Sequence, residues 1–205
     1  MDVQQSSTKQ RILDSAETLF AKHGFAGASL RQVTAAAQVN LAAVNYHFGS
    51  KENLINEVFR RRLDMLNADR VAALSTAIAR PSHALEDILG AFIRPALTLS
   101  ADSAGGAGFV RVLARAYAEH NDQLRRFLHD NYSPTLKRFA AEFARHLPHL
   151  GKQELYWRLD IVSGALTYAM ADFGMIKRRG GISETEHRDL AADHLIAFAA
   201  AGLRA

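Results

Sequence analysis

The chain has 205 residues and a formal net charge of +4, and 48% of its residues are hydrophobic. It contains no cysteine, which excludes disulfides, thiolate nucleophiles and zinc sites built on cysteine. The longest nearly uncharged apolar run, residues 161–171, is too short to span a bilayer, and the polar first eight residues lack the apolar core of a signal peptide. We therefore expect a cytoplasmic protein with no membrane partner.

Positive charge is concentrated near the amino terminus. Residues 1–62 contain eight Lys and Arg side chains against five Asp and Glu, which is most of the excess in under a third of the chain. A local positive bias of this kind suits a partner that carries phosphate groups. A solvated basic surface with no such partner explains the charge equally well.

The first three predicted helices are short and closely spaced. Apolar side chains recur every three or four positions over residues 8–23, which predicts an amphipathic helix that ends at Gly24. Ser29 and Gln32 have the spacing of a capping box and open a second helix. Asn40 then caps a third helix of about two turns. Two helices joined by a short turn, behind a supporting first helix, have the layout of a helix-turn-helix.

The third helix is too short to be stable alone, because helix nucleation is costly and few hydrogen bonds repay it. Val44 and Phe48 are four residues apart and are predicted to face a neighbouring core. Gly49 supplies the permissive backbone for a sharp turn, and Ser50 caps the next helix. The outer face of this short helix is then held rigidly at the surface, where it can contact another molecule.

The rest of the chain predicts six further helices and no strand, so the fold class is all-α with about nine helices. Their ranges are 50–79, 82–99 with Ser82 as the cap, 109–120, 122–146, 153–176, and a last helix to residue 203 that opens at a Ser183–Glu186 capping box. We place a helix-turn-helix domain at residues 1–52 and a larger helical domain for ligand binding and dimerisation at 53–205. The boundary lies inside the long fourth helix, which mechanically joins both parts.

The carboxy-terminal part has no catalytic signature. His120 and Asp122 are the nearest approach to a titratable cluster, and a helix junction explains them better than catalysis does. The nine histidines show no spacing that indicates a metal site. We predict that the protein is not an enzyme and needs no cofactor or metal.

Several strings within residues 8–60 resemble the TetR family of bacterial transcriptional repressors. The most specific is Tyr-His-Phe-Gly-Ser-Lys at residues 46–51, and others are Ile-Leu-Asp-Ser-Ala at 12–16, Gly-Phe at 24–25 and Ser-Leu-Arg at 29–31. The remainder fits the family in length and helix count. Residues 40–51, together with Leu-Tyr-Trp-Arg at 155–158 and the ending at 198–202, look most like members that respond to fatty acids or acyl-CoA.

This resemblance implies a homodimer whose last two helices form the interface, a palindromic operator in double-stranded DNA, and release by a small effector, here a fatty acid or acyl-CoA. The alternative is a dimeric helical protein that binds small molecules without reading DNA sequence. Binding that depends on salt but not on sequence would favour this alternative.

By the resemblance, Tyr46, His47 and Lys51 contact phosphates, and their donor groups suit that role. Ser29 and Arg31, at the start of the second helix, are candidates for contacts with the opposite strand. Core packing of Tyr46 and simple solvation of Lys51 and Arg31 are the competing interpretations.

Base contacts are assigned to the short third helix, with Asn40 at its start on the same surface. Asn45 can pair with adenine through two hydrogen bonds, whereas the apolar side chains can only meet thymine methyl groups or sugars. A phosphate contact or simple solvation is the competing interpretation of Asn45. The family often has Lys-Gly-Thr and an aromatic residue at these places, so this chain departs from the pattern. We expect A and T steps at the contacted centre and substantial readout of DNA shape. The apolar base-contacting residues are Leu41, Ala42 and Ala43.

Apolar helix faces in the second part predict an elongated ligand cavity and a dimer face. For each cavity residue, ordinary core packing is the competing interpretation, and the dimer-face residues could instead seal the bundle of one protomer. The cavity residues are Phe92, Phe109, Leu113, Tyr117, Phe127, Trp157, Ile161 and Tyr168. The dimer-face residues are Ala165, Leu166, Ala169, Leu190, Ala191, Leu195, Phe198 and Gly202.

Overall fold

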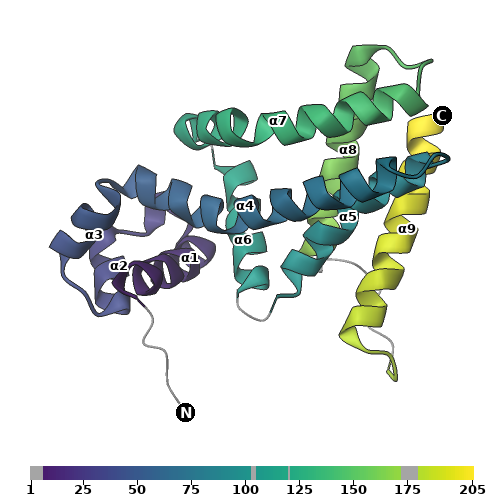
Figure 1. Cartoon of the computed structure of the whole chain (residues 1–205). Coiled ribbons are helices and arrows are strands. Elements are labelled where there is room, and N and C mark those ends of the chain that lie inside the picture. Colours follow the sequence, from purple (N-terminus) through teal and green to yellow (C-terminus); the bar gives the residue numbers. More distant parts are fainter. Residues whose placement is uncertain (1–6, 103–104, 120, 172–179) are drawn as a thin grey trace. The chain divides into compact units, whose positions relative to one another are not determined.

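The computed structural model describes residues 7–102, 105–119, 121–171 and 180–205. Within these ranges every regular element is a helix, which confirms the predicted all-α fold with nine helices (Figure 1). None of the described helices is long and apolar enough to cross a membrane. The helices are α1 (Thr8–Gly27), α2 (Leu30–Ala37), α3 (Leu41–Phe48), α4 (Lys51–Ile78), α5 (Leu85–Ser100), α6 (Gly106–Ala118), α7 (Asp122–His146), α8 (Lys152–Met170) and α9 (Glu184–Arg204).

The chain packs as two compact units. Unit 1 comprises residues 1–63 and 108–130, and unit 2 comprises residues 64–107 and 131–205. Helices α4, α6 and α7 therefore contribute residues to both units. The predicted domain boundary after residue 52 separates the expected helix-turn-helix from the expected ligand-binding part, and it does not coincide with a boundary between these two packing units. It stays a prediction.

Unit 1 is built around a row of buried aromatic rings. Phe20 and Phe25 of α1 lie 5.6 Å apart between ring centroids, and Phe59 of α4 lies 6.2 Å from Phe25. Phe109 of α6 continues the row, 5.6 Å from Phe59 and fully buried. Edge-on and tilted ring contacts of this kind add to the free energy gained by burying the rings. Helices α1, α4 and α6 thus share one core.

Helix α1 bends at Gly24 instead of ending there. Gly24 has φ 73° and ψ 173°, and the helix resumes up to Gly27. The bend removes the Phe25 N–H from the helical hydrogen-bond ladder. That N–H donates instead to both carboxylate oxygens of Glu119, at 3.1 and 3.2 Å, so a carboxylate just beyond α6 satisfies the broken turn.

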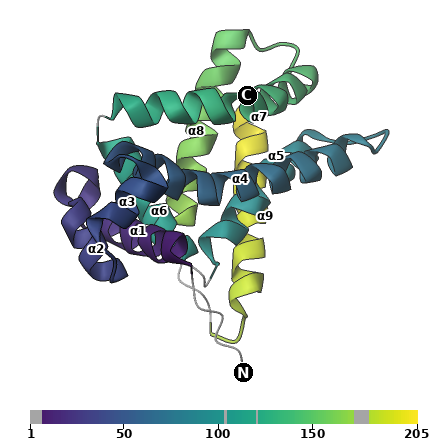
Figure 2. The same ribbon diagram turned by 60° about the vertical axis from the view of Figure 1, so that its left-hand side comes forward.

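In unit 2, α9 packs along α5, and α8 packs against both (Figures 1 and 2). Helix α5 begins at Leu85, three residues later than its predicted start at Ser82. The reason is that Asp87, inside the first turn, accepts the Ala84 N–H at 2.8 Å and so satisfies a donor without an N-cap side chain. This hydrogen bond, together with the nearby Arg80, lowers the pKa of Asp87.

Helix α8 covers most of the predicted eighth helix and ends at Met170. Ala171 is its C-cap, and residues 172–176 of the predicted helix lie outside the described residues. The Ser183–Glu186 capping box at the start of α9 is confirmed, because Ser183 Oγ accepts the Glu186 N–H at 3.1 Å and Glu186 accepts the Ser183 N–H at 2.7 Å.

Candidate nucleic-acid interface

The short helix α3 is held by its inner face. Val44 and Phe48 are buried in the core of unit 1, as predicted. Asn40 Oδ1 accepts the Ala43 N–H at 2.9 Å and caps the helix. Gly49, with φ 74°, closes it by donating its N–H to Asn45 O at 2.9 Å. Both ends and one face of this two-turn helix are therefore fixed, which compensates for its low intrinsic stability.

The turn that presents α3 depends on a residue that the sequence did not single out. Gln38 has φ 53° and ψ 50°, the left-handed conformation, and it is the one described residue other than glycine with a positive φ. At this turn the Gln38 N–H bonds to Ala35 O and the Val39 N–H bonds to Thr34 O. Because glutamine is not a typical residue for this conformation, turn chemistry gave no signal for it.

Removing the α3 cap gives a direct test of how this helix is held. Asn40→Ala should lower the free energy of unfolding by about 1 kcal/mol, because the Ala43 N–H loses its acceptor. Asn40→Asp should retain the stability, since a carboxylate also accepts that bond, and urea denaturation measures both. Equal stability of the wild type and the alanine variant would contradict the cap.

The outer face of α3 gathers the predicted DNA-contacting residues. Tyr46 is 85% exposed, which argues against its alternative role in the core. The half-buried His47 ring lies edge-on to Tyr46, with 5.1 Å between ring centroids. Leu41, Ala42 and Asn45 are exposed on the same short helix. The structure thus brings hydrogen-bonding and apolar groups together on one rigid surface.

The flanking helix starts add polar groups. Ser29 Oγ accepts the Gln32 N–H at 3.3 Å, and Gln32 accepts the Ser29 N–H at 2.7 Å, so the predicted capping box is confirmed. Arg31 is exposed in the first turn of α2. Lys51, half-buried, is the first residue of α4, and its neighbour Ser50 accepts the Asn53 N–H at 3.1 Å. Helix starts carry exposed N–H groups and a positive dipole end, which favour phosphate.

Part of the positive charge counted in the sequence is neutralised inside unit 1. Arg61 and Arg62 of α4 both bind Glu17 of α1, and Arg61 also binds Asp14. Burial works to lower the pKa of Arg61, but the hydrogen bonds and charges of Glu17 and Asp14 outweigh it and raise that pKa. Only a three-dimensional structure shows that these arginines hold α4 to α1.

The predicted cavity residues do not gather in one unit. Phe109, Leu113, Tyr117 and Phe127 belong to unit 1, and the other four belong to unit 2. Phe92 is buried, with its ring 5.2 Å from Phe139. The predicted cavity residues on α8 are exposed at the surface instead. The exposed ones are Trp157, Ile161 and Tyr168. That all eight residues line one cavity stays a prediction.

The predicted dimer-face residues divide into buried and accessible ones. Leu166 is buried, so it seals the protomer's own bundle. The half-buried ones are Ala165, Ala169, Ala191 and Leu195, and the exposed ones are Leu190, Phe198 and Gly202. Of the pair considered for catalysis, Asp122 starts α7 and is exposed, while His120 lies outside the described residues. No group of three metal-ligating side chains occurs in the described part of the chain.

Two family profiles match the sequence. Residues 12–58 match the profile of bacterial regulatory proteins of the tetR family. Residues 90–202, more than half of the chain, match the tetracyclin repressor-like C-terminal domain. This chain belongs to the TetR family. Helix α3 and its exposed surface lie within the segment that matches the tetR-family profile.

Relatives of this TetR-family chain are regulators. It is 34% identical over 90 residues to the transcriptional repressor NicS of Pseudomonas putida, covering 44% of this chain and 42% of NicS. It is 40% identical over 57 residues to the probable regulator YttP of Bacillus subtilis, covering 26% of this chain and 28% of YttP. The chain thus spans less than half of these relatives' length. The structure of the TetR-family regulator PfmR from Thermus thermophilus aligns over 97% of both chains with a TM-score of 0.62 at 20% identity, which supports the fold alone.

Proposed function

We propose that this TetR-family protein is a transcriptional repressor that binds a palindromic operator as a homodimer and is released by a small effector. The observation that carries the proposal is α3, whose inner residues Val44 and Phe48 are buried while Tyr46 stands out from the surface. In a symmetric dimer two such helices enter successive major grooves, about 34–36 Å apart. The operator then has the twofold symmetry of the protein.

Within the half-site, phosphate contacts fix the register and base contacts set the sequence. Tyr46, His47 and Lys51 supply the donors for phosphates. Asn45 is the one amide on the outer face of α3 and pairs with adenine, while Leu41 meets thymine methyl groups. This division supports a half-site with A and T steps at its centre.

Two substitutions on this surface should have different consequences. Asn45→Ala should relax the preference for adenine at one position of each half-site, at a cost of about 1–3 kcal/mol for the original site. Lys51→Ala should weaken all sequences alike and reduce the slope of log affinity against log salt by about 2 for the dimer, since each protomer loses one phosphate contact.

The measurement is selection of sites from a random DNA pool, followed by binding titrations at several salt concentrations. Lys137→Ala is the matched control, because Lys137 is exposed on α7, outside the helix-turn-helix. It should leave both sequence preference and salt slope unchanged. Failure to enrich any palindrome would support the alternative of a helical ligand-binding protein without sequence-specific DNA binding.

For the dimer we propose the outer faces of α8 and α9. Ile161 and Tyr168 stand two turns apart on α8, and Trp157 precedes them by one turn, all three exposed. On α9, Leu190 and Phe198 are exposed two turns apart. Large apolar side chains gathered on neighbouring helices mark a protein interface rather than an ordinary surface. We therefore assign the three α8 residues to the dimer rather than to a ligand cavity.

For the effector, the likeness of residues 40–51 and 155–158 to fatty-acid-responsive members supports a fatty acid or acyl-CoA. Within unit 2, the buried rings of Phe92 and Phe139 supply apolar surroundings that an acyl chain would need. Titration of the operator complex with oleoyl-CoA tests this class. An acyl ligand that binds the protein but leaves operator affinity unchanged would contradict release by this ligand. Release requires a coupling free energy between the two sites, and that coupling would lower operator affinity.

A further inference from the structure

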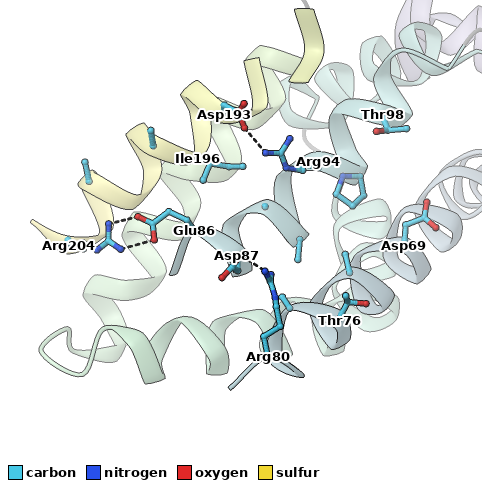
Figure 3. Close-up of a pocket in the computed structure, with 17 residues that line it drawn as sticks. Asp69, Thr76, Arg80, Glu86, Asp87, Arg94, Thr98, Asp193, Ile196 and Arg204 are labelled. Carbon is cyan, nitrogen blue, oxygen red and sulfur yellow. Dashed lines mark hydrogen bonds and ion pairs between the residues drawn. The ribbon is translucent and has the colours of Figure 1, made fainter. Parts of the chain in front are cut away.

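A large cavity that opens widely to solvent lies in unit 2 between α4, α5 and α9, apart from the predicted ligand residues. Its volume is about 1000 Å³, at the upper end of the range for sites that hold small organic molecules. None of the eight residues predicted to bind ligand lines it. Figure 3 shows its walls, with charged side chains from all three helices.

The walls between these charges are made of small, mostly apolar residues. Small side chains leave the space unfilled, and a Cβ added to Gly90 would already contact Ile196 Cδ1 at 3.7 Å. The surface can therefore accept a hydrocarbon chain in van der Waals contact. The small and apolar lining residues are Ala73, Ala77, Gly90, Ala91, Pro95, Ile196, Ala197 and Ala201.

Each arginine of the lining already has a carboxylate partner. Arg94 Nη2 lies 2.5 Å from Asp193 Oδ1. Arg204 makes two hydrogen bonds to Glu86, at 2.6 and 2.8 Å, and these bonds lower the pKa of Glu86. The third pair joins Arg80 Nη2 and Asp87 Oδ1 at 2.8 Å. An anionic ligand would have to compete with these carboxylates for each arginine.

Asp69 is the exception among the charges of the lining. Its carboxylate is exposed and, within the described residues, has no ion-pair partner, so the three arginines and four carboxylates of the lining leave one negative charge without an oppositely charged partner. Figure 3 shows Asp69 at the far side of the cavity from Arg204 and away from the three ion pairs. Asp69 also lines an adjoining cavity of about 390 Å³, where a charged end group has room. That smaller cavity is also lined by Asp102 and Arg188. Their charges are opposite in sign, so the net charge of the combined lining stays at one negative charge.

We propose that this cavity binds a single-chain organic cation, an alkylammonium compound. The ammonium group lies against the Asp69 carboxylate, and the alkyl chain lies over the alanines of α4 and α5 towards Ile196. Charge complementarity at Asp69 selects a cation over an anion, and the apolar walls select an alkyl chain over a small hydrated ion. The inference does not depend on DNA binding.

The test compares ligands that share one chain length and differ in charge. Octyltrimethylammonium, octanoate and octyl glucoside are titrated into the full-length protein by calorimetry, each below its micelle-forming concentration. The cation should bind at least tenfold more tightly than the other two. Asp69→Asn should remove this preference, whereas Asp160→Asn, at an exposed carboxylate on α8, should leave it intact.

A second variant tests the location without changing charge. Ala197→Phe places a ring in the cavity from α9 and should weaken binding of the cation at least tenfold, with the folded state checked by circular dichroism. Absence of cation binding, equal affinity for octanoate, or an unchanged preference in Asp69→Asn would each overturn the proposal. Because no DNA is present, failure here is distinguishable from failure of the proposed repressor function.

Discussion

Replacing Glu17 by alanine should lower the free energy of unfolding by about 3–5 kcal/mol, the usual cost of removing one partner from a buried ion pair. Glu17 is 4% exposed and Arg62 is 7% exposed. Arg62 Nη2 lies 3.2 Å from Glu17 Oε1, and Arg61 binds the other carboxylate oxygen. The alanine variant removes this counter-charge from the buried guanidinium of Arg62.

Asp14→Ala provides the matched control. Asp14 binds Arg61 at 2.5 Å, and its side chain is 64% exposed. Exposed pairs contribute about 1 kcal/mol or less, so this variant should unfold nearly as the wild type does. Urea denaturation followed by circular dichroism measures both, with the slope compared to confirm that the same surface is exposed. A loss below about 1 kcal/mol in Glu17→Ala would contradict the stabilising role of this buried ion pair.

Phe198→Asp should convert the protein to a monomer and reduce operator affinity about a thousandfold. Phe198 is 69% exposed on α9, within the face that we propose for dimerisation. A twofold interface contains each substitution twice. Loss of a central aromatic contact costs about 2 kcal/mol or more at each site, and about 4 kcal/mol corresponds to three orders of magnitude in affinity.

Sedimentation velocity measures the oligomeric state, and titration with the selected operator measures the affinity. Leu136→Asp is the control, because Leu136 is 47% exposed on α7, outside the proposed dimer face. It should remain dimeric and bind DNA normally. A dimeric Phe198→Asp variant with unchanged affinity would place the interface elsewhere.

Local chemistry made several elements predictable from the sequence. Ser29 and Ser183 start helices because their hydroxyls accept an N–H from the first turn, and the matching Gln32 and Glu186 complete each capping box. Val44 and Phe48 face inward because their spacing places them on one side of α3. These features depend on residues within four positions of each other, so the sequence contains all the information that they need.

The start of α5 shows where local reasoning fails. Ser82 is a good capping residue, yet the helix begins at Leu85, where Asp87 satisfies the Ala84 N–H and also binds Arg80. Two competing caps lie within one turn of chain. Propensity alone does not rank them, because the choice depends on how the whole segment packs.

The amino-acid sequence by itself determined the all-α class, the helix-turn-helix and the outward position of Leu41, Asn45 and Tyr46 on α3. Only the tertiary structure decided which apolar faces are covered. Trp157 and Phe109 are both large aromatic residues in predicted helices, but the first is 62% exposed and the second is fully buried. It also decided that Arg61 and Arg62 face Glu17, and that Asp69 borders a cavity. The physical reason is that hydrophobic and charged side chains are stabilised by burial or by an oppositely charged partner, but which residue provides this depends on packing between segments far apart in the sequence.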